Sequence, residues 1–407
     1  MRPARSKPEI KANTALRGIG ALLVMVYHLG EIKTAPGEVT RFIDLGANID
    51  LVLDMFFLLS GFIMAYIYAE TFRDTVSGKS MGRFLWFRFA RTYPVHIFAL
   101  CIYLVERGFY IFSDAHLGNF LNIPVPPAIF YTDPNLQNTP FTLIANILLI
   151  HGVGVTSQLS WNYPSWTLSA EFAAYVVFPF LCLYIGRFGK IGAVIQIALC
   201  VGAYVALEAV YGNLNVPGYD GAIRCVPGFA IGVAIYTLSS YVIKLSDRQL
   251  HIAQGVSLAV LLLTYSFAHS QVLVMITLAV FVWLTTENRG WVSVALSWSP
   301  LHYLGLLSYS IYMTHVTVGK PVFPVLDLIG DWLGLADEWW WLYFTLAVAM
   351  GVTICISVLI FRYVEMPARI ALDRMVKRPA GAAASPATVA ATAEPVASSA
   401  PTDARRA

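Results

Sequence analysis

The chain has 407 residues, of which 57% are hydrophobic and 13% are charged, and its formal net charge is +3. A water-soluble domain could not bury that much apolar surface, and repeated apolar runs of about 20 residues are typical of a polytopic helical membrane protein. The small net charge gives no indication of nucleic-acid binding, so no nucleic-acid partner is expected. The expected fold is an all-α bundle of transmembrane helices.

About ten apolar segments are long enough to cross a membrane as helices. A further run, 141–153, is short and is flanked or interrupted by Pro140, His151 and two glycines. We interpret it as a re-entrant or interfacial segment, since broken helix is tolerated in a membrane where it lines a cavity. The expected spans are 14–32, 51–70, 84–112, 166–186, 191–211, 222–243, 251–269, 271–287, 301–323 and 340–362.

The distribution of basic residues predicts the orientation of these spans. With ten spans and a cytoplasmic N-terminus, most of the 27 lysines and arginines fall on the cytoplasmic side, as the positive-inside rule requires. Residues 1–13 are then a basic cytoplasmic N-terminus, 14–372 the transmembrane domain, and 373–407 a cytoplasmic Ala/Pro-rich tail that we expect to be disordered. The first run resembles a signal peptide, but Arg17 and His28 interrupt it and no cleavage site follows. We therefore expect an integral protein of the plasma membrane, which is the inner membrane in a bacterium.

The first predicted span contains an arginine and a histidine, Arg17 and His28. They are eleven positions apart, which on an α-helix corresponds to about 1100° of turn and a rise of about 16 Å, so both side chains lie on one face. A cation and a titratable base are costly to place in lipid. We therefore expect this face to border a protein interior or a water-filled cavity.

Two aspartates, Asp50 and Asp54, precede the apolar run of the second span. They are four positions apart and share a helix face, where either carboxylate could cap the helix N-terminus, since the helix dipole favours negative charge there. That interpretation is stronger for Asp50, because Asp54 lies about a turn deeper. A buried Asp54 carboxylate beside His28 would instead raise the basicity of the histidine and fix its tautomer.

Four further polar residues in predicted spans each allow two interpretations. Arg88 and Arg91, three positions apart at the start of the third span, either snorkel to lipid headgroups or bind phosphate oxygens in bidentate fashion. Glu171, at the start of the fourth span, is either a capping-box acid or a catalytic carboxylate. His315, inside the ninth span, either forms a hydrogen bond between helices or belongs to the site.

The longest stretch between predicted spans, about 113–165, falls on the outer side and contains aromatic and amide side chains but no Lys or Arg. Such side chains stack on and hydrogen-bond to sugars, and aromatic residues also form belts at membrane interfaces. The five cysteines lie far apart, with neither metal-ligand spacing nor a disulfide framework. We interpret them as core-packing residues and expect no metal site.

Together, these residues resemble the motifs of the acyltransferase family 3 membrane proteins. The resemblance covers about 14–372, and six motifs in the family's order are hard to obtain by chance. The matching residues are Arg17 and His28 for Arg-x10-His; Asp54, Phe56, Phe57, Ser60, Gly61 and Phe62 for Asp-x-Phe-Phe-x-x-Ser-Gly-Phe; Arg88, Arg91, Tyr93 and Pro94 for the arginine-rich entry to the third span; Trp166, Thr167, Leu168, Ser169 and Glu171 for Trp-Ser/Thr-Leu-Ser-x-Glu; Ser308, Tyr309, Tyr312 and His315 for Ser-Tyr-x-x-Tyr-x-x-His; and Val364, Glu365 and Pro367 for Val-Glu-x-Pro.

The chain also departs from the family pattern. Thr14 stands where many members have an aspartate, and Glu171 is followed by Phe172 where a second acid is common. The single acid weakens any role that needs two acids sharing a proton. Many members carry a fused esterase-like domain outside the membrane; none is recognisable in this sequence, so we expect acceptor transfer in the membrane domain or on a separate protein.

The resemblance implies transfer of an acyl group, most often acetyl, from cytoplasmic acyl-CoA to a hydroxyl of an envelope or exported polysaccharide or of a lipid-linked saccharide. We expect no permanently bound cofactor, with acyl-CoA as a co-substrate. The lipid bilayer, the acyl donor and the saccharide acceptor are the expected partners, with polysaccharide-assembly proteins as further candidates.

The implied mechanism gives His28 the central role. Neutral imidazole removes a hydroxyl proton well near physiological pH, and Asp54 would orient the ring by analogy with a catalytic triad. An acyl-histidine intermediate is the alternative to direct transfer. The expected site residues are His28, Asp54 and Glu171 for catalysis, Arg17, Arg88 and Arg91 for acyl-CoA, and Trp166, Arg224 and His315 on the acceptor side.

Other functions stay open alongside this one. The acceptor of the acyl group could be a small metabolite instead of a saccharide. A transporter also uses His, Asp and Arg in the membrane as a proton relay, but the sequence shows no pair of similarly broken helices in its two halves. A non-catalytic scaffold of a polysaccharide-assembly complex would tolerate loss of His28.

Overall fold

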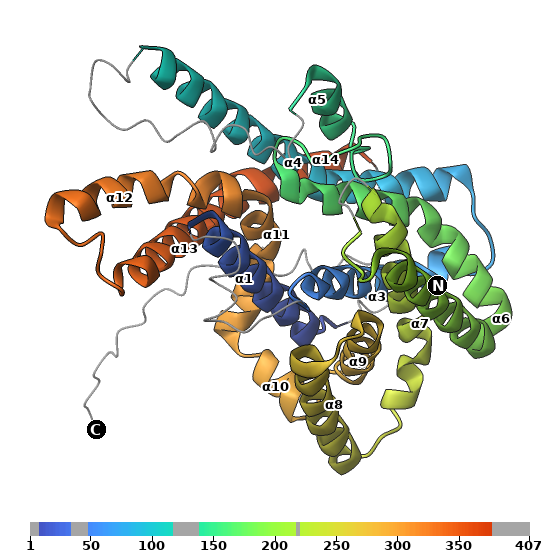
Figure 1. The fold of residues 1–407 in the computed structure, drawn as a ribbon. Coiled ribbons are helices and arrows are strands. Elements are labelled where there is room, and N and C mark those ends of the chain that lie inside the picture. The colour runs from blue at the N-terminus through green and yellow to red at the C-terminus, as the bar shows by residue number, and fades with distance from the viewer. Residues whose placement is uncertain (1–7, 34–47, 117–137, 217–219, 377–407) are drawn as a thin grey trace, which may run out of the picture. The chain divides into compact units, whose positions relative to one another are not determined.

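The computed structural model describes residues 8–33, 48–116, 138–216 and 220–376, and of these Ile10–Val376 form one unit. The described residues form helices and no β-strand (Figure 1), so the prediction of an all-α fold is confirmed. Most of the two predicted cytoplasmic ends lies outside the described residues. The helices are α1 (Lys11–Lys33), α3 (Leu51–Phe72), α4 (Gly78–His116), α5 (Pro140–Ile147), η3 (Tyr163–Ser165), α6 (Trp166–Tyr211), α7 (Gly221–Val242), α8 (Asp247–Phe267), α9 (Gln271–Leu284), α10 (Trp291–Leu296), α11 (Ser299–Gly319), α12 (Val322–Leu333), α13 (Trp341–Ile360), η5 (Phe361–Glu365) and α14 (Met366–Met375).

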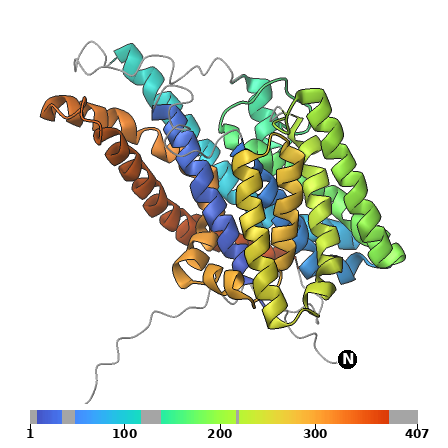
Figure 2. The same cartoon turned by 60° about the horizontal axis from the view of Figure 1, so that its bottom comes forward.

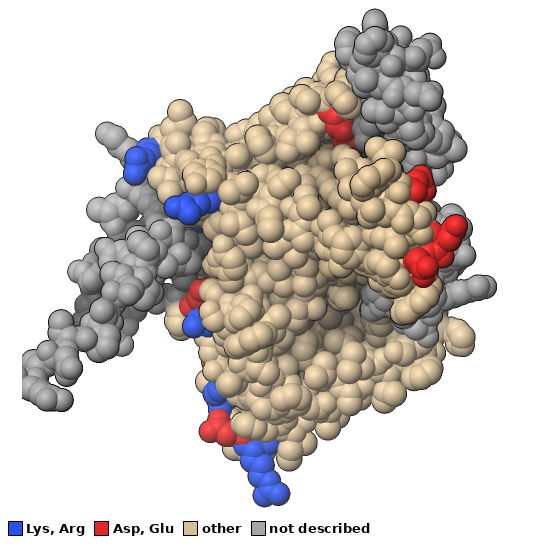
Figure 3. Space-filling view, turned by 90° about the vertical axis from the view of Figure 1, so that its left-hand side faces the viewer, with Lys and Arg blue, Asp and Glu red and all other residues tan. Residues whose placement is uncertain are grey.

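Six described segments are long and apolar enough to cross a membrane, which makes the chain an integral membrane protein; the count of ten spans stays a prediction. Figure 3 shows one face of the molecule with uncharged residues over most of its area and charged side chains towards its margins. Apolar side chains are exposed on several helices, for example Leu199 (70%) and Phe267 (76%), as lipid contact requires. The six segments are Lys11–Lys33, Leu51–Phe72, Tyr163–Tyr211, Gly221–Val242, Asp247–Phe267 and Trp341–Met375.

Helix α6 is broken within its 46 residues. The break is at Gly189, whose backbone has φ 59° and ψ −140°, a conformation that glycine adopts far more readily than other residues. The two arms of α6 on either side of this residue correspond to the predicted spans 166–186 and 191–211. A single glycine therefore separates two elements that hydropathy alone predicted as separate helices.

The run predicted as re-entrant contains α5, which has only eight residues. Eight residues rise about 12 Å, too little to cross a hydrocarbon core of about 30 Å. After α5 the chain turns at Leu149, which has φ 56°, and then folds back against α6: the carbonyl of Leu149 accepts a hydrogen bond from Ser169 Oγ at 2.7 Å, and Gly152 N donates to the same hydroxyl at 2.9 Å. The broken helix is therefore confirmed, and entry into the membrane stays a prediction.

Glycines allow two pairs of helices to cross at very short backbone distance. Where α1 crosses α11, a Cβ atom on Gly305 would lie 2.0 Å from the Thr14 carbonyl oxygen. Where α3 crosses α7, a Cβ atom on Gly61 would lie 1.9 Å from the Phe229 carbonyl oxygen. Figure 2 shows α1, in blue, between the orange α12 and α13 and the yellow and green helices α6 to α9. The first crossing fixes α1, which carries Arg17 and His28, against α11.

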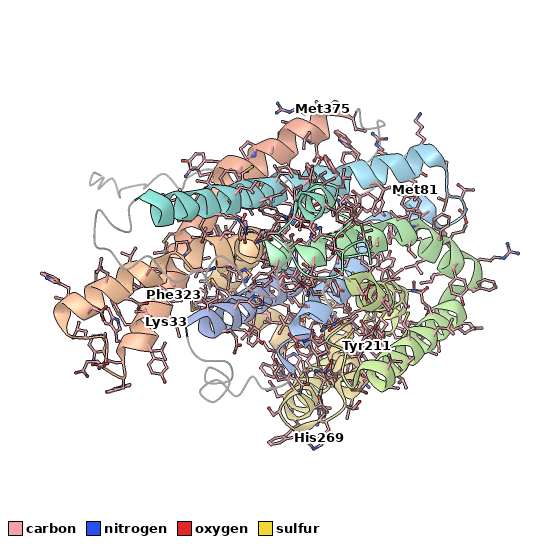
Figure 4. All side chains as sticks on the ribbon, turned by 45° about the horizontal axis from the view of Figure 1, so that its top comes forward. Lys33, Met81, Tyr211, His269, Phe323 and Met375 are labelled. Carbon is pink, nitrogen blue, oxygen red and sulfur yellow. The ribbon has the colours of Figure 1, made fainter. Side chains whose placement is uncertain are left out.

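The C-terminal part of the described chain returns to α4. Helix α13 continues through the π-helical turn η5 into α14, which lies beside α4 (Figure 4, where Met375 marks its end). Trp86 Nε1 on α4 donates a hydrogen bond to the Leu372 carbonyl on α14 at 3.0 Å. This contact places α14, a short helix that was not predicted, beside the arginine-rich part of α4.

Candidate active site

His28 on α1 and His315 on α11 form a pair of hydrogen-bonded imidazoles. The distance from Nδ1 of His28 to Nε2 of His315 is 2.8 Å, and the rings lie nearly parallel, with their planes at 12°. His315 is fully buried and its Nδ1 lies 2.7 Å from the Tyr312 carbonyl oxygen, whereas His28 is half-buried. The predicted hydrogen bond of His315 between helices is therefore confirmed, and its partner is the predicted base.

The hydrogen bonds of this pair determine which nitrogen carries each proton when both rings are neutral. A carbonyl oxygen only accepts, so Nδ1 of His315 must donate to Tyr312 and its Nε2 is left as an acceptor. His28 must then donate from Nδ1, which leaves its Nε2 with a free lone pair. That nitrogen has no hydrogen bond to any described residue. The arrangement therefore presents His28 Nε2 as a base.

The segment that follows the α5 region contacts His28. The Tyr163 ring of η3 meets the His28 ring edge-on, with 5.4 Å between the ring centroids. Asn162 Nδ2 donates to the Met313 carbonyl on α11 at 2.9 Å, which ties this segment to the helix of His315. The preceding residue, Trp161, has φ 53°, a region sparsely populated by residues other than glycine. Residues of the predicted aromatic stretch 113–165 thus reach the predicted base.

Asp54 lies elsewhere in the bundle, so the prediction that it orients His28 is corrected. Its carboxylate forms an ion pair with Arg224 of α7, with 2.6 Å between Oδ2 and Nη2, and both side chains are fully buried. It also accepts a hydrogen bond from the Tyr204 hydroxyl at 3.1 Å. Asp54 and Arg224 therefore neutralise each other, and the residue hydrogen-bonded to His28 is His315.

The same ion pair bears on the predicted role of Arg224 with the acceptor. Arg224 is 0% exposed, and besides Asp54 it donates to the Asp50 carbonyl at 2.7 Å, so it offers no surface to a sugar in this structure. Trp166, also predicted on the acceptor side, is 8% exposed and packs against the Phe57 ring. Both side chains are therefore buried in this structure, and their place on the acceptor side stays a prediction. Asp50 forms no side-chain cap on α3, so its predicted capping bond is absent.

The predicted donor residues separate into two kinds. Arg88 is 8% exposed, donates to Tyr68 and Met64 at 3.3 Å each, and lies over the Tyr68 ring. Arg17 and Arg91 are half-buried, and neither forms a hydrogen bond or an ion pair with another described residue. Arg17 and Arg91 are nevertheless close enough to interact electrostatically. Their free guanidinium groups make them the stronger candidates for an anionic ligand.

Glu171 lies near this arginine region and not at a helix cap. It accepts a short hydrogen bond from the Ser60 hydroxyl of α3, and Ser165 at the start of α6 makes no side-chain cap, so the capping-box interpretation fails. Its carboxylate lies within electrostatic range of Arg17 and Arg88. Glu171 therefore balances part of the positive charge at the Arg17 end of α1. Among the described residues, no group of three or more His, Cys, Asp and Glu is placed to hold a metal ion.

Comparison with known proteins gives the family. The sequence pattern of a family described as an acyltransferase domain matches residues 12–360. The chain belongs to acyltransferase family 3. This match spans the arginines and histidines of α1, α4 and α11, so the candidate site lies within the acyltransferase domain.

Individual relatives share only low sequence identity with this chain, or match only part of it. The peptidoglycan O-acetyltransferase OatA of Listeria monocytogenes is 22% identical over 387 residues, which are 89% of this chain and 56% of that protein. The acyltransferase MdmB of Streptomyces mycarofaciens is 31% identical over 170 residues, 41% of this chain and 37% of that protein. The match therefore covers only about half of OatA and about a third of MdmB. No solved structure matches the chain.

Proposed function

We propose that this chain is a membrane O-acyltransferase that moves an acyl group, acetyl in the simplest case, from acyl-CoA to a hydroxyl of a saccharide. The observation that carries the proposal is the chain of hydrogen bonds from the Tyr312 carbonyl through His315 to His28, because it leaves a basic nitrogen free. Membership of the family supports acyl transfer. The peptidoglycan acceptor in the name of the Listeria relative supports a cell-envelope saccharide.

The free nitrogen of His28 suits both steps of the reaction. Nε2 takes the proton of the attacking hydroxyl while the new ester C–O bond forms and the thioester C–S bond breaks. The same proton then passes to the departing CoA thiolate, so protons and charge balance. In the covalent route the same unprotonated Nε2 attacks the thioester, the C–S bond breaks and the CoA thiolate leaves. The acceptor hydroxyl then takes the acyl group from the imidazole as the acyl–nitrogen bond breaks, and its proton ends on the thiolate.

Helix α1 connects this base to the proposed donor region. Arg17 and His28 lie on one continuous helix, Lys11–Lys33, and the basic residues of the sequence favour a cytoplasmic N-terminus. The Arg17 end then faces the compartment that contains acyl-CoA, and guanidinium groups there bind phosphate oxygens well. The His28 end faces the side where an envelope saccharide would arrive. This orientation supports a location in the plasma membrane.

Removal of the His28 imidazole tests the proposal directly. Cells that produce the wild-type protein are compared with cells that produce His28→Ala, and envelope saccharides are analysed for an added acyl mass. We expect a drop in acylation of about 10²- to 10⁴-fold, the usual contribution of a positioned base. His251→Ala, which removes an exposed histidine of α8, is the matched control and should leave acylation unchanged.

Two results would contradict the proposal at different points. Wild-type levels of acylation in correctly inserted His28→Ala would exclude His28 as the base. If the wild-type protein acylates small metabolites and no saccharide, the proposed acyl transfer stands and a saccharide acceptor is excluded.

A further inference from the structure

We propose that Arg369 of α14 completes, with Arg17 and Arg91, a binding site for the phosphate groups of the acyl donor. The inference rests on the proposed function, because it takes acyl-CoA as that donor. It adds a residue from a part of the chain that hydropathy did not mark as a helix. It also separates these three arginines from Arg88, which we regard as a packing residue.

Three elements far apart in sequence contribute one arginine each. Arg17 comes from α1, Arg91 from α4 and Arg369 from α14, which lies along α4 through the bond from Trp86 to the Leu372 carbonyl. Arg369 is half-buried, as Arg17 and Arg91 are. None of the three forms an ion pair or a hydrogen bond with another described residue.

A single buried carboxylate lies among these arginines. Glu365, in the π-helical turn η5, is 2% exposed and lies within electrostatic range of Arg17, Arg91 and Arg369. It accepts a hydrogen bond from the Ser310 hydroxyl of α11 at 2.7 Å and not from an arginine. π-helical turns often occur at functional sites, and this turn sets both Glu365 and the start of α14. Glu365 thus interacts electrostatically with all three arginines and forms an ion pair within 4 Å with none of them.

The charges of this region leave the guanidinium groups available. Glu171 near Arg17, Asp373 near Arg369 and the central Glu365 are the carboxylates that interact with these arginines. Glu171 and Glu365 accept hydrogen bonds from serine hydroxyls, and neither of these two carboxylates pairs with the three arginines within 4 Å. Close like charges without a pairing anion are unfavourable, so an anionic ligand would stabilise the cluster. The pyrophosphate and ribose phosphate of CoA are ligands that guanidinium groups bind in bidentate fashion.

Arg88 differs from these three in a way that fits a packing role. It is 8% exposed, and its guanidinium group is held by Tyr68 and Met64 and lies over the Phe84 ring as well. A phosphate would have to displace these contacts to reach it. Arg88 therefore supports α4 behind Arg91.

The test measures CoA binding by the purified full-length protein in detergent, by calorimetry, for the wild type and four variants. Arg369→Gln should weaken CoA affinity about tenfold or more, since a charge-assisted bidentate contact is lost. Arg374→Gln removes an exposed arginine of the same helix and should change the affinity less than about twofold. Arg369→Lys keeps the charge, so it should show an intermediate loss and should fold if Arg369→Gln does not.

Shorter ligands and vesicles distinguish the remaining outcomes. Pantetheine, which lacks the phosphates, should bind the wild type and Arg369→Gln equally. Unchanged CoA affinity in Arg369→Gln, with weakened affinity in Arg91→Gln, would overturn the role of Arg369 and leave the proposed function standing. Unchanged CoA affinity together with reduced retention on phosphatidylglycerol vesicles, compared with phosphatidylcholine, would assign Arg369 to lipid headgroups. A wild type that does not bind CoA would overturn the proposed donor, and the inference with it.

Discussion

Arginine occurs in two different environments within the same membrane domain. Arg224 is 0% exposed and is paired with Asp54 at 2.6 Å. Arg17 and Arg91 are half-buried and have no ion pair among the described residues. A buried charge that is fully paired contributes to the architecture, whereas a partly buried charge without a partner is available to a ligand.

The two histidines of the site also differ in whether their polar groups have partners. Both nitrogens of His315 are engaged, one by the Tyr312 carbonyl and the other by His28, and the side chain is fully buried. His28 has one nitrogen engaged and one free. His315 therefore holds His28 through one nitrogen, and the free nitrogen of His28 is the one that can react.

The largest effect on stability is expected where the charge is fully paired. Arg224→Leu leaves the Asp54 carboxylate buried without a partner, which should lower the free energy of unfolding by about 3–5 kcal/mol. Thermal unfolding of the purified protein in detergent measures the loss. The double variant Asp54→Leu with Arg224→Leu should recover much of it, because no uncompensated charge remains. A stable Arg224→Leu protein with wild-type unfolding would show that the pair is not structural.

A smaller effect is expected from replacement of His315, whose two ring nitrogens are both hydrogen-bonded, and it should appear in the catalytic rate. His315→Leu removes the acceptor for His28 Nδ1, so the protons of His28 are no longer fixed and kcat should fall by about 10²-fold. His315→Gln keeps an amide oxygen that can accept this hydrogen bond and should retain more activity than His315→Leu. Acylation assays in membranes with matched protein levels measure both. Equal activity in the two variants would exclude the positioning role.

Most of the helices could be predicted from sequence because long runs of apolar residues identify membrane spans. The predicted segments 14–32 and 51–70 correspond to α1 and α3 within a few residues. The short helices α10, α12 and α14 were missed, because six to twelve residues are too few for a hydropathy window. Arg369 was missed with α14. The Val-Glu-x-Pro motif, whose Pro367 stands two residues before Arg369, is the sequence signal that could have pointed to it.

The contacts of the site were harder to predict than its residues. His28 and His315 are 287 positions apart, and Asp54 and Arg224 are 170 positions apart. The packing of α1 on α11 and of α3 on α7 therefore determines which residues form pairs. Asp54 was expected beside His28 because a buried carboxylate there would raise the basicity of the histidine and fix its tautomer, as in a catalytic triad. That reasoning identifies groups that need partners, but it contains no information on which partner each one finds.

The smallest effect on stability is expected at the unpaired arginines, and its size distinguishes them from Arg224. Arg17→Gln with Arg91→Gln breaks no ion pair and relieves repulsion between like charges, so the free energy of unfolding should fall by no more than about 0.5 kcal/mol. The same variant should bind CoA at least about tenfold more weakly, and the wild-type affinity should fall as salt is raised. Arg289→Gln is the matched control: it loses an ion pair to Asp247 and bonds to three carbonyls, so it should lose stability without losing CoA affinity. A loss of several kcal/mol in the double variant, with unchanged CoA affinity, would place Arg17 and Arg91 in the same class as Arg224, because their charges would then support the fold and not a ligand.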